Sequence, residues 1–139
     1  MVTINPYINF DGNCEAAFDF YRTVFGGEFL NKSRFKEAPP EAKMSVDEAE
    51  KILHVALPIG KNNILMGSDC PCSAGKVNTG NNVNISIHPE SEQDATRIFN
   101  TLSSGGTVIM PLAKTFWNAY FGMLTDKFGV QWMVNYQYD

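Results

Sequence analysis

The chain has 139 residues, of which 44% are hydrophobic and 19% are charged, and its formal net charge at pH 7 is −4. This length and composition fit one globular domain with a real core. The negative balance, with no basic face, disfavours nucleic acid as a partner. No apolar run approaches the roughly 20 residues that a bilayer crossing needs, and no charged-then-apolar signal precedes the first strand, so we expect a cytoplasmic protein without a membrane partner.

One pattern occurs twice along the chain. A short apolar strand at 4–10 is followed by an amphipathic helix at 13–25 and by Gly26-Gly27. A second strand at 83–87 is followed by a helix at 91–104 and by Gly105-Gly106. Double glycines past a helix are typical stop signals, so the repeat indicates two related modules.

The first module continues after its helix with three more expected strands. Asn13 is the expected N-cap of that helix. Its aromatic stripe, spaced by three and four residues, is expected to pack on a sheet: Phe18, Tyr21 and Phe25. The further strands are predicted at 28–36, 52–59 and 63–67, and a stretch rich in Gly, Ser, Asn, Pro and Cys at 70–80 reads as a linker.

The second module repeats this order. Ser91 is expected to cap the second helix, with Asp94 three residues later in a capping-box arrangement. Three strands are predicted at 107–112, 120–125 and 130–136. The prediction is therefore an α+β fold in a single domain, 1–139. It has two paired βαβββ modules, at about 1–69 and 81–139, that form a curved mixed sheet with an open cleft where they meet.

Alternation along each strand predicts which residues face the cleft. His54 shares a face with Ala56 and Pro58, opposite the more apolar set of that strand. In the strand at 83–87 the apolar residues should lie under the helices and Asn84 should point into the cleft. The full set of expected cleft residues is His54, Met66, Asn84, Trp117, Tyr120, Trp132 and Met133. For Trp132, burial in the core is the competing interpretation.

No motif for nucleophilic or phosphate chemistry is present in the sequence. There is no Gly-x-Ser-x-Gly elbow, no Walker loop and no dinucleotide fingerprint. Cys70 and Cys72 have one residue between them, a spacing that suits neither an unstrained disulfide nor a structural zinc site. Cys14 lies in the first helical turn, where a helix dipole favours a thiolate, but a small packing residue is the preferred interpretation.

Taken together, several segments resemble the PhnB-like branch of the glyoxalase/bleomycin-resistance/dioxygenase (vicinal oxygen chelate) superfamily. They span essentially the whole chain, in the family's order: residues 5–17 with Phe20-Tyr21 and Phe25-Gly26-Gly27, then 54–60, 65–69 and 126–132. The resemblance implies paired βαβββ modules and a homodimer. In the superfamily's enzymes it also implies a divalent metal in the cleft.

The metal ligands implied by the resemblance do not carry over to this chain. Their positions fall near Pro6 in the first strand, at Asn82 or Asn84 in the second module, and at Met133 in the last strand. Divalent ions of this kind prefer imidazole and carboxylate ligands, and His54 alone supplies one. We therefore expect no metal and no other cofactor.

Two functions remain open. The first is binding of a small molecule in an apolar, aromatic-edged cleft without metal. The alternative is a metal-dependent lyase, isomerase or dioxygenase with non-standard ligands, such as His54 with Asp69 or a cysteine. The residues do not decide between a binding protein and an enzyme. In either case we expect a homodimer.

Overall fold

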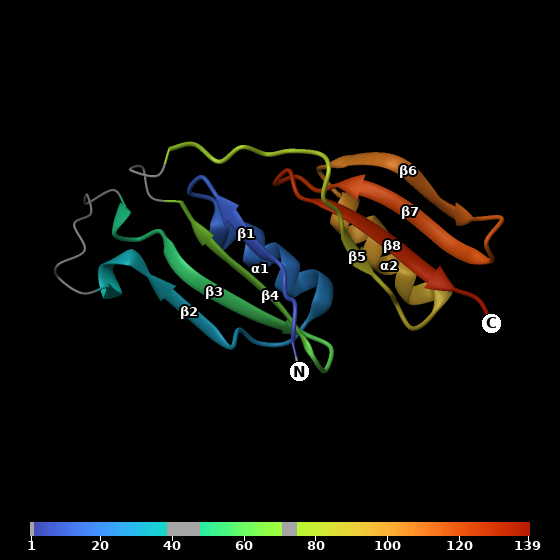
Figure 1. Ribbon diagram of the computed structural model, residues 1–139, viewed down its shortest axis with the longest axis horizontal. Coiled ribbons are helices and arrows are strands. Elements are labelled where there is room, and N and C mark those ends of the chain that lie inside the picture. The colour runs from blue at the N-terminus through green and yellow to red at the C-terminus, as the bar shows by residue number, and fades with distance from the viewer. Residues whose placement is uncertain (1, 39–47, 71–74) are drawn as a thin grey trace. The chain divides into compact units, whose positions relative to one another are not determined.

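The computed structural model describes residues 2–38, 48–70 and 75–139 (Figure 1). The chain divides into two compact units, Met1–Asn78 and Thr79–Asp139. Each unit is a βαβββ module with one helix and one four-stranded mixed sheet, which confirms the predicted α+β class. The eight strands form two sheets of four. Within the described ranges, no helix is long and apolar enough to cross a bilayer.

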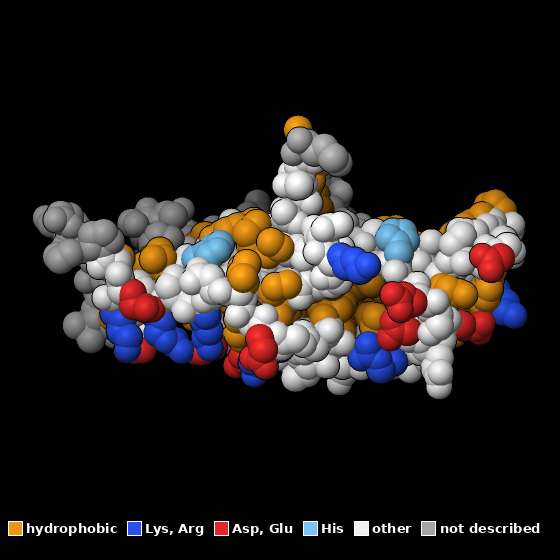
Figure 2. Space-filling view, turned by 90° about the horizontal axis from the view of Figure 1, so that it is seen from below, with side chains coloured by type: hydrophobic (Ala, Val, Ile, Leu, Met, Phe, Trp, Pro, Cys, Tyr) orange, Lys and Arg blue, Asp and Glu red, His pale blue; other side chains and the backbone are white. Residues whose placement is uncertain are grey.

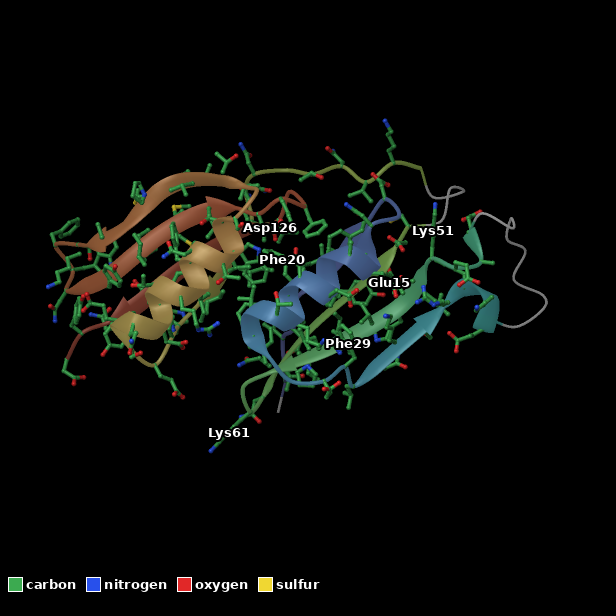
Figure 3. The ribbon with its side chains drawn as sticks, turned by 180° about the vertical axis from the view of Figure 1, so that it is seen from behind. Glu15, Phe20, Phe29, Lys51, Lys61 and Asp126 are labelled. Carbon is green, nitrogen blue, oxygen red and sulfur yellow. The ribbon has the colours of Figure 1, made fainter. Side chains whose placement is uncertain are left out.

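In unit 1 the sheet has the strand order β1-β4-β3-β2. Its elements are β1 (Tyr7–Phe10), α1 (Cys14–Phe25), β2 (Asn31–Arg34), a 3-10 turn (Phe35–Glu37), β3 (Ile52–Ile59) and β4 (Asn63–Asp69). Strand β1 runs parallel to its neighbour β4, and the other pairs are antiparallel. Helix α1 packs against β3 and β4 on one face of the sheet (Figure 3).

The apolar stripe of α1 explains where this helix packs. Its buried residues recur at three- and four-residue spacing: Cys14, Ala17, Phe18, Tyr21 and Val24. The ring of Phe18 lies directly over Gly67 of β4, where an added Cβ would stand 2.6 Å from Phe18 Cε1 and 2.8 Å from the Ile8 carbonyl oxygen. Only glycine permits this close approach of helix and strand.

The start of α1 differs from the expected Asn13 cap. Asn13 stands at the N-cap position but makes no side-chain cap hydrogen bond. Instead, Asp69 Oδ1 accepts hydrogen bonds from the backbone N–H groups of Gly12 (2.9 Å) and Cys14 (3.0 Å), and its Oδ2 accepts one from Ile52 (2.9 Å). Asp69 is 2% exposed. A carboxylate from the end of β4 therefore binds the free N–H groups that the local asparagine leaves unpaired.

In unit 2 the sheet has the strand order β5-β8-β7-β6, and β5 is parallel to β8. The elements are β5 (Ile85–Ile87), α2 (Glu92–Ser103), β6 (Thr107–Lys114), β7 (Ala119–Thr125) and β8 (Gln131–Gln137). Helix α2 packs on β6, β7 and β8 through Ala95, Ile98, Phe99 and Leu102. The predicted cap is confirmed: Ser91 Oγ accepts from the Asp94 N–H at 3.0 Å.

A second buried carboxylate organises the turn between β7 and β8. Asp126 Oδ1 accepts from the backbone N–H groups of Phe128 (2.8 Å) and Val130 (3.1 Å). Its Oδ2 accepts from Trp132 Nε1 at 2.8 Å. The turn and the first core residue of β8 are thereby joined to one side chain, which is 3% exposed.

Replacing Asp69 by alanine is expected to destabilise the protein strongly. Three backbone donors lose a charged acceptor in a buried position, and we expect a loss of about 3 kcal/mol or more in the free energy of unfolding. Urea unfolding followed by far-UV circular dichroism measures the change. Asp19→Ala, on the exposed side of α1, is the matched control and should lie within about 0.5 kcal/mol of the parent. A loss for Asp69→Ala no greater than for the control would contradict this assignment.

An ion network joins α1 to the edge strand β2. Glu15 is labelled in Figure 3, and its Oε2 lies 2.6 Å from Arg34 Nη2 and 2.7 Å from Lys32 Nζ. The hydrogen bond from Arg34, followed by that from Lys32, lowers the pKa of Glu15 from 4.5 to about 2. Because the Glu15 side chain is 40% exposed, solvent screens these pairs and we expect them to contribute less than about 1 kcal/mol.

The network should give a small pH-dependent contribution to stability. A carboxylate with a depressed folded-state pKa stabilises the fold fully above its unfolded value, here 4.5, and loses this effect as the pH falls toward 2. We expect Glu15→Gln to be less stable than the parent at pH 6, with the difference shrinking to nothing near pH 2. Unfolding curves over that pH series test this, and a difference that stays constant would exclude a Glu15 contribution.

Candidate functional site

Each sheet has one face under its helix and an opposite face, here called the open face. Side chains alternate along a strand, and paired residues on neighbouring strands share a face, so the register assigns each residue. Gly67 and Leu65 lie on the α1 side of unit 1, and the intervening Met66 therefore lies on the open face. The same reasoning puts Met133 on the open face of unit 2, between Trp132 and Val134, which are buried in the core.

Two rows of residues cross the open face of unit 1. The first row consists of Tyr7, Met66, Ala56 and Asn31. The second consists of Asn9, Ser68, His54 and Ser33, with His54 placed beside Ser68 by continuing the β3–β4 register by one residue. Figure 2 shows hydrophobic side chains gathered beside the histidine of this unit.

His54 is held by its neighbours on this face. Its Nδ1 is 3.4 Å from the Tyr7 hydroxyl, and the two rings stack with centroids 5.7 Å apart at 29°. Ser33 Oγ donates to the His54 carbonyl oxygen at 3.5 Å. In the same row, Ser68 Oγ donates to Asn9 Oδ1 at 3.3 Å. Tyr7 is nonetheless 46% exposed, so its phenol ring and hydroxyl are accessible at the surface.

Neither row contains a carboxylate, lysine or arginine. The charged residues of β2, Lys32 and Arg34, are paired with Glu15 of α1. The site on unit 1 therefore combines dipolar hydrogen-bonding groups with a thioether and two rings, without a strong local charge.

The open face of unit 2 is richer in methionine. Met110, Met123 and Met133 are register partners on three successive strands, and Ser86 of β5 completes the row. Phe121 lies in the next row. Trp117, from the turn between β6 and β7, packs edge-to-face on the Phe121 ring, with the two ring centroids 5.5 Å apart. Methionine is flexible and polarisable, so such a row forms an adaptable apolar surface.

The structure places the expected cleft residues in three kinds of position. His54, Met66 and Met133 lie on open faces, although on two different units. Trp117 is 43% exposed and borders the unit 2 open face. Asn84 is half-buried and lies directly before β5, because β5 is shorter than the predicted strand. Val83, which was expected under the helix, is 72% exposed. The cleft expected between the modules stays a prediction.

Tyr120 and Trp132 require a correction, because both share the helix-covered face. Trp132 is 1% exposed, and its indole N–H donates to buried Asp126, so it belongs to the core. Tyr120 is paired with Tyr136, and its hydroxyl lies 3.2 Å from Thr96 Oγ1 of α2. Neither side chain joins the open face.

The sequence did not reveal the three neighbours of His54 on this face: its ring partner Tyr7, and the Asn9 and Ser68 of its row. Alternation within the first strand does show that Tyr7 and Asn9 share a face. The missing information was the neighbour of that strand, because β1 pairs with β4 across more than fifty residues of chain. The βαβ handedness and pairing rules narrow this choice but do not decide it.

The donor set does not fit the metal site of the superfamily's enzymes. The Pro6 carbonyl oxygen already accepts the Met66 N–H at 3.0 Å, and Met133 offers only a thioether. Asp69, the suggested partner of His54, is buried and already accepts three backbone hydrogen bonds. Among the described residues, no group of three or more His, Cys, Asp and Glu side chains is placed to hold an ion.

The cysteines follow the packing interpretation where the structure describes them. Cys14 is buried, and that burial, reinforced by the nearby Asp69 charge, raises the pKa of its thiol well above the usual range. The thiolate that a helix dipole favours is therefore not formed here. Cys70 is a half-buried free thiol, and Cys72 lies outside the described residues.

Comparisons with known proteins agree with this architecture. The sequence model of the Glyoxalase/Bleomycin resistance protein/Dioxygenase superfamily matches residues 3–134. Protein YjdN of Escherichia coli is 31% identical over 95% of this chain and 93% of its own length. Protein PA1353 of Pseudomonas aeruginosa superimposes with a TM-score of 0.88 at 40% identity over all of both chains.

A third relative shares the fold at lower identity. It is a Bacillus cereus PhnB protein described as a putative 3-demethylubiquinone-9 3-methyltransferase. Its TM-score is 0.75 at 24% identity, covering 97% of this chain and 99% of that one. The likeness in fold agrees with the PhnB-like resemblance.

Proposed function

Because the chain belongs to the glyoxalase/bleomycin resistance protein/dioxygenase superfamily, we propose that it binds a small molecule on the open face of unit 1 without a metal site. The observation that carries this proposal is the Tyr7–His54 pair, which stands exposed on a sheet face beside Met66. A pair that served only the core would be expected under the helix, among the buried residues.

The chemistry of the face favours a planar ligand. Aromatic rings prefer offset or edge-to-face contacts with other rings, and in the Tyr7–His54 stack the Tyr7 side is 46% exposed. Met66 adapts to the shape of the ligand, while Asn9, which is exposed, supplies a polar contact next to it. The methionine row of unit 2 offers a second adaptable apolar surface of the same kind.

The metal-dependent alternative is a lyase, isomerase or dioxygenase that polarises substrate oxygens through an ion. No arrangement of described residues favours it, because the carried-over positions hold proline, asparagine and methionine and because Asp69 is engaged by the backbone. We therefore propose binding rather than metal-assisted turnover.

We also propose that the protein acts as a homodimer in the cytoplasm. Each sheet ends in edge strands, β2 and β6 among them, and an exposed edge is normally covered by another element or chain. On β6 three large apolar side chains are exposed: Val108, Ile109 and Met110. A second copy is the partner that the family resemblance implies.

Binding should depend on His54 and not on the chain's other histidine. We expect some members of a panel of planar aromatic acids, amines and neutral ring compounds to raise the melting temperature of the parent protein. His54→Ala should weaken binding of these compounds by about tenfold, because it removes a stacked ring and a hydrogen-bonding nitrogen. His88→Ala is the matched control, since His88 lies outside this face and contacts Ser86.

Two results would contradict the proposal. The first is equal binding by the parent and His54→Ala proteins, which would move the site elsewhere. The second is stoichiometric zinc, iron, nickel or manganese in protein purified without chelator, measured by elemental analysis, which would favour the metal-dependent alternative.

The dimer is tested by light scattering coupled to size-exclusion chromatography. The expected mass is about twice the 15.5 kDa of one chain at micromolar concentration. A mass of one chain over the whole concentration range would refute the dimer.

A further inference from the structure

We infer that the open face of unit 1 recognises an oxygen acceptor, of the carboxylate kind, on its planar ligand. The recognition uses two free donors, one from Asn9 and one from the Tyr7–His54 pair. This inference rests on the proposed function and specifies the ligand of the same site.

The first donor is the Asn9 amide. Ser68 Oγ donates to Asn9 Oδ1 at 3.3 Å, and this bond sets the orientation of the amide. The Nδ2 group, with its two hydrogens, is therefore directed away from Ser68. Among the described residues no atom accepts a hydrogen bond from Asn9 Nδ2, and Asn9 is exposed. A ligand oxygen at this position meets a donor whose orientation is already set.

The second donor comes from the Tyr7–His54 pair in either tautomer. If the Tyr7 hydroxyl donates to His54 Nδ1, the neutral imidazole carries its hydrogen on Nε2, which this bond does not use. If His54 Nδ1 donates instead, the Tyr7 hydroxyl hydrogen is free. In both cases the pair uses one hydrogen internally and leaves one for a ligand.

The two donors flank Ser68 on the same face. Neighbouring strands are about 4.8 Å apart, so the backbones of Asn9 and His54, two strands apart, are separated by about 10 Å. In our proposal the acceptor group of the ligand lies between these two side chains, over β4, where Ser68 itself is 9% exposed. The adjacent row, with Met66 at its centre, then lies under the ring that carries that group.

The two rows hold no Asp, Glu, Lys or Arg side chain, so hydrogen-bond donors and not an ion pair distinguish the ligand groups. No carboxylate stands in either row to attract an ammonium or to occupy the donors. Hydrogen bonds from neutral donors to a carboxylate are stronger than those to neutral acceptors. The site thus selects by donor geometry and not by an ion pair.

The test compares two probes of one shape, naphthoate and naphthylmethylamine, by calorimetry and by amide NMR shifts of unit 1. We expect the parent protein to bind naphthoate at least about tenfold more tightly. Asn9→Asp keeps an oxygen for Ser68 but replaces the free amino group with a charged oxygen. In this variant the preference should invert.

Tyr7→Phe is the second variant, because it keeps the ring and removes only the hydroxyl. The lost hydroxyl either donates to the ligand itself or holds the imidazole hydrogen on Nε2, so in both tautomers Tyr7→Phe should weaken naphthoate binding severalfold and leave naphthylmethylamine unchanged. Equal affinities of the two probes in the parent and in both variants, with shifts on unit 1, would overturn this inference and leave the proposed function standing. If the parent binds neither probe but binds other compounds of the panel, this inference alone is overturned. If it binds no compound of the panel, both are overturned.

Discussion

The buried carboxylate of Asp69 is the interaction on which unit 1 depends. It comes from the end of β4 and binds backbone donors of the β1–α1 turn, the first turn of α1 and the start of β3. These segments are far apart in the chain, so one side chain determines where helix and strands meet. A buried carboxylate is stable only when hydrogen-bond donors surround it, and here the backbone supplies three.

In unit 2 the corresponding backbone donors are bound by side chains that lie closer to them in the chain. Asp126 binds the turn that follows it and the indole of Trp132, while Ser91 caps α2 directly. In both units the helix then covers one sheet face through close contacts, Phe18 on Gly67 and Phe99 on Gly122. The polar and adaptable side chains are consequently left on the opposite face. The location of the candidate site thus follows from how each core is closed.

The superfamily includes enzymes that use a metal, whereas the side chains at the corresponding positions of this chain are not metal ligands. The fold is one on which metal-assisted reactions occur, but fold alone does not carry function. Here the positions that would hold an ion offer a proline carbonyl in use by the backbone, amides and a thioether. The open face of unit 1 instead presents stacked rings, hydroxyls and a free amide. Recognition by dipolar donors and apolar surface is the activity that these groups support.

The sequence by itself determined the repeat, the two helices with most of their buried stripes, the bounds of β3, and the separation of His54 from Val55 and Leu57 on opposite faces of that strand. These features depend on local periodicity, which reports which residues share a side of an element. The tertiary structure alone decided which strands are neighbours. Pairing of β1 with β4 brought Asn9 to Ser68 across 59 residues, and a buried hydrogen bond to Asp126 withdrew Trp132 into the core. Neither the pairing of distant strands nor the side-chain hydrogen bond over six residues leaves a periodic signal in the chain.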